Sequence, residues 1–148
     1  MKKVIVIVGP TAVGKTKLSI ELAKKFDGEI INADSTQIFK GLDIATAKVT
    51  EEEKENIVHH LIDIKDITDD YTVYDYQKDA RGCIDDILKR GKTPILVGGT
   101  GLYIKACLYD YQFTEEGKIT NDYLDFSNDE LYEMLLKVDP ETEIHKNN

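Results

Sequence analysis

The sequence predicts an α/β fold in which a mainly parallel sheet is flanked by helices. Short apolar runs typical of buried strands alternate along the chain with segments whose apolar residues recur at helical spacing. The first of these runs, residues 4–8, leads directly into Gly9-Pro10-Thr11-Ala12-Val13-Gly14-Lys15-Thr16. This octapeptide matches the phosphate-binding pattern G-x-x-x-x-G-K-[ST], and an amphipathic helix pattern follows it. A strand, a glycine-rich loop and a helix in this order predict a P-loop NTPase-like fold.

Four strands are expected where apolar or β-branched residues dominate, at residues 3–8, 29–32, 58–64 and 94–97. The first run is apolar on both faces, which predicts a central place in the sheet. Because helices separate the strands, right-handed crossovers between parallel strands are expected.

Helical patterns occupy residues 15–26, 73–89 and 102–108, and a short acidic helix start covers 51–56. The stretch 33–48, which is rich in Asp, Ser, Thr and Gly, is expected to be a functional loop with a helical turn. Ser127-Asn128-Asp129-Glu130 has the pattern of a capping box, so it should open a last helix that ends before Pro140.

The composition is that of a globular protein, with 148 residues of which 41% are hydrophobic. No apolar run approaches the length of a membrane span, and the apolar start leads into the glycine loop rather than to a cleavage site. Cys83 and Cys107 lie in apolar helix patterns and are expected to be small buried side chains. These features predict a cytoplasmic monomer without membrane association.

Charge is unevenly distributed along the chain, whose formal net charge is −9. Residues 1–50 contain eight lysines and five acidic residues, a net +3, whereas residues 51–148 contain eleven basic and twenty-three acidic residues, a net −12. The acidic part argues against a broad nucleic-acid surface. A polyanionic partner is therefore expected at the N-terminal third, which holds the glycine loop, or at residues outside this chain.

The loop Gly9–Thr16 predicts a site for a di- or triphosphate. Gly9 and Gly14 let the backbone turn tightly against a ligand, and the amides of the loop and first helical turn point into one concavity. Lys15 adds a mobile positive charge, and the Thr16 hydroxyl is a candidate Mg²⁺ ligand. The motif does not say which phosphate compound is bound.

Two further segments follow strand ends and should converge with the loop on one crevice, Asp34–Gln37 and Gly98–Gly101. In Asp34-Ser35-Thr36-Gln37, a carboxylate, two hydroxyls and an amide suit recognition of a polar ligand, but they also suit an Asx turn or helix cap. These two readings stay equally open. Gly98–Gly101 could be only a tight strand-to-helix turn, but its glycines also permit close approach to a ligand, with Thr100 as the one side chain able to form hydrogen bonds.

Other polar residues give weaker signals. His59 and His60 are adjacent on a predicted strand and point to opposite faces, so a structural role is favoured over a shared metal. Asp63 only faintly resembles the acidic end of a Walker B strand, and the strand at 94–97 ends in glycines. The features of an ATP-hydrolysing motor are therefore missing.

Several blocks of the sequence together resemble the tRNA dimethylallyltransferases, also called tRNA isopentenyltransferases. The resemblance covers nearly the whole chain. It rests, in order, on Gly9–Thr16, Asp34-Ser35-x-Gln37-Ile38, Lys40-Gly41-Leu42-Asp43-Ile44-x-Thr46-Ala47-Lys48, His59-His60-Leu61-Ile62-Asp63, Gly98-Gly99-Thr100-Gly101-Leu102-Tyr103-Ile104 and Val138-Asp139-Pro140.

The resemblance implies that a dimethylallyl group passes from dimethylallyl diphosphate to the exocyclic amine of the adenine 3′ of the anticodon of a tRNA. The residues Gly9, Pro10, Thr11, Ala12, Val13, Gly14, Lys15 and Thr16 would then hold the diphosphate, with Mg²⁺ at Thr16. Asp34 would accept the proton of the attacking amine, with Thr11 beside the reacting groups. Ser35, Thr36 and Gln37 would hold the flipped adenine and its neighbours, and Thr100 would contact the tRNA.

The chain departs from the family pattern in several places. Ala45 replaces a usual glycine and Phe39 a usual tyrosine. Residues 115–127 lack an arginine-bearing helical insertion, and the family continues beyond the length of this chain for about as long again. The resemblance therefore implies an N-terminal portion of the enzyme or an internally shortened version of it. Its parts would be a P-loop α/β core at 1–111, a shortened insertion with one helix at 112–138 and a return segment at 139–148.

Two other function classes remain open. A small-molecule or nucleotide kinase would use the same loop for ATP, but it predicts an arginine-rich lid, and Arg81 and Arg90 are the only arginines of the sequence. A non-catalytic nucleotide-binding module would bind phosphate without prenyl transfer.

Overall fold

The computed structural model describes residues 3–44, 46–113, 123 and 125–145, and the chain divides into two compact units, Met1–Phe113 and Thr114–Asn148. The first unit contains the sheet, and the second contains helix α5. Residues 114–122 and 124 of the predicted insertion lie outside the described residues, so its proposed limits at 112 and 138 stay predictions. No helix in the described ranges is long and apolar enough to cross a membrane.

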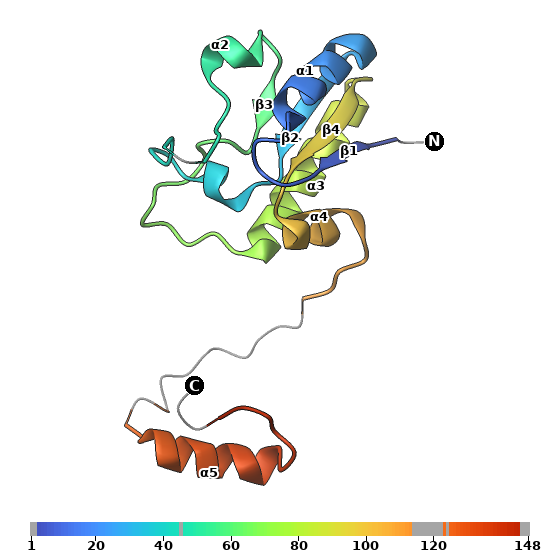
Figure 1. Cartoon of the computed structure of the whole chain (residues 1–148). Helices are drawn as coiled ribbons and strands as arrows, with labels where there is room; N and C mark the ends of the chain where they lie inside the picture. Colours follow the sequence, from blue (N-terminus) through green and yellow to red (C-terminus); the bar gives the residue numbers. More distant parts are fainter. Residues whose placement is uncertain (1–2, 45, 114–122, 124, 146–148) are drawn as a thin grey trace. The chain divides into compact units, whose positions relative to one another are not determined.

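The first unit is built on a four-stranded parallel sheet with the order β1-β4-β2-β3, as Figure 1 shows. The strands are β1 (Ile5–Val8), β2 (Gly28–Asn32), β3 (His59–His60) and β4 (Thr93–Gly98). β4 pairs with both β1 and β2, so Ile95 lies opposite Ile5 on one side and Ile30 on the other. The predicted parallel α/β fold is confirmed.

Two strand predictions were wrong. β1 lies at the edge of the four described strands rather than at the centre, and its Val6 and Val8 are exposed. Apolar residues on both faces do not determine how many neighbours a strand has. The strand predicted at 58–64 contains only two residues, because Leu61 and Asp63 adopt left-handed backbone conformations with φ of 61° and 55°. A chain with such residues cannot stay in an extended ladder.

The helices agree closely with the sequence patterns. They are α1 (Lys15–Phe26), α2 (Glu51–Lys54), α3 (Val73–Lys89), α4 (Gly101–Leu108) and α5 (Asn128–Val138), with a 3-10 helix η1 (Ser35–Ile38). The capping box at Ser127 is confirmed, since its side chain accepts from the Glu130 amide and the Glu130 carboxylate accepts from the Ser127 amide. Thr50 and Thr72 cap α2 and α3 in the same way.

Helices cover both faces of the sheet and create two apolar clusters. Because neighbouring side chains of a strand point to opposite faces, Ile31 and Leu96 join one cluster and Ile30 and Ile95 the other. The first cluster includes α3 and α4, where the rings of Tyr76 and Tyr103 stack with their centres 3.9 Å apart; the second contains Ile20 and Ala23 of α1. Cys107 is buried in the first cluster and Cys83 is half-buried against it. Burial raises the pKa of the Cys107 thiol to about 11.

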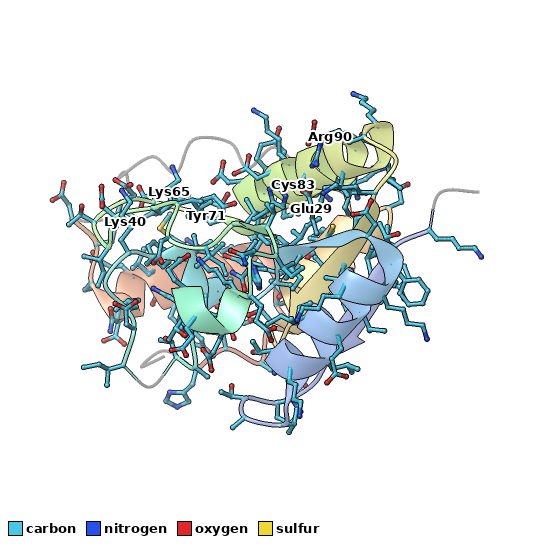
Figure 2. The ribbon with its side chains drawn as sticks, turned by 90° about the horizontal axis from the view of Figure 1, so that it is seen from above. Glu29, Lys40, Lys65, Tyr71, Cys83 and Arg90 are labelled. Carbon is cyan, nitrogen blue, oxygen red and sulfur yellow. The ribbon has the colours of Figure 1, made fainter. Side chains whose placement is uncertain are left out.

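The buried carboxylate of Glu29 links the amino end of β2 to Arg90 at the C-terminal end of α3 (Figure 2). The Glu29 side chain is 3% exposed, and both its oxygens bond to the guanidinium of Arg90. His60 Nε2 lies 2.7 Å and Lys92 Nζ 3.1 Å from the same carboxylate. The Arg90 guanidinium, with His60 and Lys92, holds the pKa of Glu29 well below its usual range despite the opposing effect of burial.

Replacing Glu29 with Gln is expected to lower the free energy of unfolding by about 3 kcal/mol at neutral pH, because a buried ion-pair network loses its central charge. Since folding lowers the pKa of Glu29, its contribution is fully present above the unfolded value near 4.5 and is lost as the pH falls below that value. The difference between wild type and variant in urea titrations should therefore shrink in acid. Asp86→Asn, which removes only an exposed partner of Arg90, is the control. An equal effect of the two substitutions would contradict a special role for Glu29.

Candidate functional site

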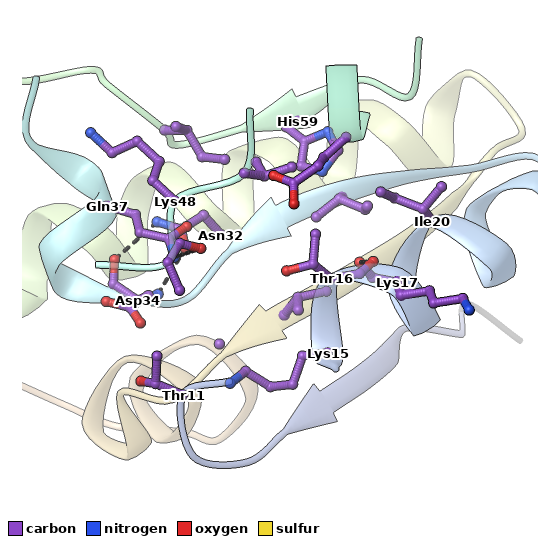
Figure 3. Close-up of a pocket in the computed structure, with 18 of the residues that line it drawn as sticks. Thr11, Lys15, Thr16, Lys17, Ile20, Asn32, Asp34, Gln37, Lys48 and His59 are labelled. Atoms are coloured by element: carbon purple, nitrogen blue, oxygen red, sulfur yellow. Dashed lines mark hydrogen bonds between the residues drawn. The ribbon is translucent and has the colours of Figure 1, made fainter. Parts of the chain in front are cut away.

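A cavity of about 570 Å³ opens at the carboxyl ends of the strands (Figure 3). Its walls come from the glycine loop, from Asp34 and Gln37 after β2, and from Gly98 at the end of β4. The expected convergence of three chain segments on one crevice is confirmed. Figure 3 shows Lys15 and Thr16 on one side of this cavity, and Gln37 and Lys48 with Asp34 on another.

The glycine loop wraps around the start of α1 as a phosphate-binding loop requires. Ala12 and Gly14 have φ of 65° and 88°, so the backbone turns through left-handed conformations at two places. No side chain caps α1, which leaves the amides of its first turn available to oxygen atoms of a ligand. Lys15 Nζ donates to the carbonyl of Pro10 at 2.6 Å, so the ammonium group lies across the mouth of the loop.

Most of the predicted phosphate-binding residues face the cavity. Those that line it are Thr11, Ala12, Gly14, Lys15 and Thr16, while Gly9, Pro10 and Val13 complete the loop without lining it. Lys17 of α1 also lines the cavity and was not singled out from the sequence.

Asp34 is a helix cap that also borders the cavity. It is the N-cap of η1, and its Oδ1 accepts from the Thr36 amide at 3.0 Å and from the Thr36 hydroxyl at 2.7 Å. Asp34 also lines the cavity. The cap fixes the rotamer of the carboxylate, so Thr36 orients a group that faces the ligand space rather than lining that space itself.

Asn32 holds the main chain of Asp34 and was missed by the sequence analysis. Its side chain is buried, accepts from the Asp34 amide at 3.0 Å and donates to the Asp34 carbonyl at 3.0 Å. The same amide donates to the carbonyl of Leu61 at 2.9 Å, which stabilises the left-handed turn after β3. An asparagine at a strand end carries no signal of such a long-range contact.

Thr100 and Ser35 join the ends of β4 and β2. Thr100 Oγ1 accepts from the Ser35 amide at 3.0 Å and lies 3.3 Å from the Ser35 hydroxyl, and the Thr100 amide donates to the carbonyl of Ala33. Neither side chain lines the cavity. In this structure both residues therefore fix the geometry of the strand ends beside Asp34.

The two adjacent histidines have separate surroundings, as expected for neighbours on a strand. His59 lines the cavity with Nδ1 2.8 Å from the Ile57 carbonyl, and burial lowers its pKa. His60 pairs with Glu29. Among the described residues no group of three or more His, Cys, Asp or Glu side chains is arranged to hold a metal. Mg²⁺ commonly takes one or two protein ligands and completes its shell with phosphate oxygens and water, so the Thr16 hydroxyl fits such an ion.

A family model for IPP transferases matches residues 37–148. The chain belongs to this family. It is 55% identical to the tRNA dimethylallyltransferase of Anoxybacillus flavithermus over 152 residues, which cover 99% of this chain and 49% of that protein. The resemblance found in the sequence blocks is thus confirmed.

Solved structures agree with this assignment. The crystal structure of the tRNA delta(2)-isopentenylpyrophosphate transferase from Staphylococcus epidermidis is 47% identical with a TM-score of 0.73, and the match covers all of this chain and 51% of that one. A eukaryotic dimethylallyltransferase acting on tRNA is 40% identical with a TM-score of 0.83, over 100% of this chain and 39% of that one. This IPP transferase-family chain spans about half the length of the curated relatives it matches.

Proposed function

We propose that the protein carrying this chain is a tRNA dimethylallyltransferase. The observation that carries the proposal is that the phosphate loop and Asp34 line the same cavity, so a bound diphosphate and a proton-accepting carboxylate would lie at one place. The relatives named as tRNA dimethylallyltransferases support the prenyl donor and the tRNA acceptor. A flipped adenine would enter beside Asp34 and Gln37, with Ser35, Thr36 and Thr100 supporting that edge.

In the proposed reaction, the exocyclic nitrogen of adenine forms a bond to the terminal carbon of the prenyl group as the bond from that carbon to the diphosphate oxygen breaks. The diphosphate leaves with the bonding electrons, and loop amides and Lys15 stabilise its growing negative charge. Asp34 accepts the proton that the nitrogen loses, with Thr36 holding its Oδ1 in place. Mg²⁺ at Thr16 would add positive charge at the leaving diphosphate.

The two arginines of this chain do not form the lid that a kinase would require. Arg81 donates to the carbonyls of Ala106, Cys107 and Tyr109, and Arg90 bonds to Glu29. Both guanidinium groups are used to hold the fold, so neither is available to stabilise a transferring phosphoryl group.

The direct test incubates the complete natural protein with unmodified tRNA, Mg²⁺ and dimethylallyl diphosphate labelled in the prenyl group. Label should accumulate in the tRNA and in no small acceptor. Parallel reactions with labelled ATP test the kinase alternative, and phosphoryl transfer from ATP without label in tRNA would overturn the proposal. Binding of both compounds without either reaction would identify a non-catalytic module.

Replacing Lys15 with Met is expected to weaken binding of dimethylallyl diphosphate by about 10- to 100-fold, the loss of one charge-assisted hydrogen bond. Titration calorimetry on the unreacted donor measures the dissociation constant. Lys25→Met is the matched control, because Lys25 lies over the Phe26 ring at the far end of the same helix. Equal donor affinity in the Lys15 variant and the control would remove the loop lysine from the donor site.

A further inference from the structure

Lys48 is a nearly buried lysine at the edge of the cavity, and no role was predicted for it. Its side chain is 6% exposed. Its Nζ donates to Asp63 Oδ1 at 2.6 Å, Asp43 Oδ1 at 2.8 Å and the Phe39 carbonyl at 3.0 Å, which uses all three N–H groups. Burial alone would lower the pKa of Lys48, but the two carboxylates together raise it, so the side chain stays charged.

The contacts of Lys48 lead back to Gln37 by two routes. Asp63, which binds the Lys48 ammonium group, donates its backbone amide to the Gln37 carbonyl at 3.1 Å. On the other route, the Gln37 side-chain Nε2 donates to the carbonyls of Thr46 at 3.1 Å and Ala47 at 3.4 Å, directly before Lys48. The main chain and the side chain of Gln37 are therefore both tied to elements that Lys48 holds together.

This arrangement fixes which end of the Gln37 amide faces the ligand. Because Nε2 is used by Thr46 and Ala47, Oε1 is the atom left to accept a hydrogen bond in the cavity that Gln37 lines. Figure 3 shows Gln37, Lys48 and Asp34 at the same side of that cavity. If the segment at 46–48 moved away from Gln37, Nε2 would lose its two acceptors and the side-chain amide could rotate by 180°.

We propose that Lys48 is a positioning residue for substrate recognition: by joining the segment at 46–48 to Asp63, it sets the orientation of the Gln37 amide beside Asp34. The inference rests on the proposed tRNA-modifying function, and it assigns Lys48 to the acceptor side of the cavity rather than to the diphosphate side. Loss of the Lys48 charge should therefore affect the use of tRNA and leave donor binding intact.

Lys40 offers a matched control in the same loop. Its ammonium group pairs with Asp66 at 3.1 Å, and both side chains are more than half exposed. The Lys40 backbone amide donates to the Lys65 carbonyl, and a side-chain substitution keeps this contact (both residues are labelled in Figure 2). Lys40→Met removes one charge from the loop without touching the bonds to Gln37.

The test is a double-mutant cycle in the complete natural protein with Lys48→Met, Gln37→Ala and the two combined. We expect Lys48→Met to lower kcat/KM for tRNA about tenfold, and to cost less than about twofold when Gln37 is already Ala. The dissociation constant of dimethylallyl diphosphate should change less than about twofold. Lys48→Arg, which keeps the charge, should lose less than Lys48→Met, and Lys40→Met should match the wild type.

The Gln37 side-chain amide gives a readout that does not depend on the reaction. In ¹⁵N-correlated NMR spectra its two proton signals should be shifted from the exposed-glutamine position in the wild type and in Lys40→Met, and should move to that position in Lys48→Met. Equal losses from Lys48→Met in both Gln37 backgrounds, or an unmoved Gln37 signal, would overturn the positioning role. A wild-type protein that modifies no tRNA would overturn the proposed function, while the NMR result would still decide the role of Lys48.

Discussion

Replacing Asp34 with Asn is expected to lower prenyl transfer to tRNA by about 10³-fold, within the range for loss of a general base. Donor binding should be nearly unchanged. Asparagine keeps an oxygen at the Oδ1 position, so the bonds from the Thr36 amide and hydroxyl that cap η1 can persist. The substitution thus removes the proton acceptor while preserving the local structure.

Single-turnover assays with excess enzyme measure the transfer step, and calorimetry measures donor affinity separately. Asp66→Asn is a suitable control, because Asp66 is an exposed carboxylate paired with Lys40. If Asp34→Asn weakened donor binding as much as it slowed transfer, Asp34 would serve the diphosphate or its metal instead. Normal transfer by the variant would remove Asp34 from the chemistry altogether.

Local sequence patterns predicted the parts of the fold that local physics determines. The bounds expected for α1 and α3 are those observed, because their apolar stripes and end signals lie within the helices themselves. The predicted length of β3 was wrong because a contact distant in the sequence ends this strand. Its apolar run continues beyond His60, but Leu61 is held in a left-handed conformation by a bond from Asn32 that spans 29 residues. Such a contact leaves no periodic trace in the sequence.

The candidate site shows the same division. The phosphate loop could be recognised because its function depends on contiguous residues with fixed spacing. The polar segment after β2 could be located, but its role could not be predicted, since a helix cap and a ligand contact require the same residue types. In the structure Asp34 caps η1 and also lines the cavity. Lys48 could not be predicted, because its three acceptors come from Phe39, Asp43 and Asp63 and meet only in the folded chain.

Gly98 is expected to be the position in the sheet that tolerates substitution least. A Cβ atom there would lie 2.2 Å from the backbone carbon and oxygen of Ala33, far inside van der Waals contact. Relief would require β4 to move away from β2, although the Ala33 amide bonds to the Val97 carbonyl at 2.7 Å. Gly98→Ala should therefore lower the free energy of unfolding by about 4 kcal/mol or more, at the extreme end of single substitutions.

The same displacement would disturb the site, because Asp34 follows Ala33 directly and the Thr100 amide bonds to the Ala33 carbonyl. Urea titrations followed by circular dichroism measure the free energy of unfolding. Donor binding at low temperature, where part of the variant stays folded, measures whether the site is still formed. Gly82→Ala is the matched control, since a Cβ there has no neighbour within 4 Å and alanine in a helix should stabilise by about 0.5–1 kcal/mol. A Gly98→Ala protein with the same urea midpoint as the wild type would show that the strand ends can separate without loss of stability. The close packing of Gly98 on Ala33 would then have no part in forming the site.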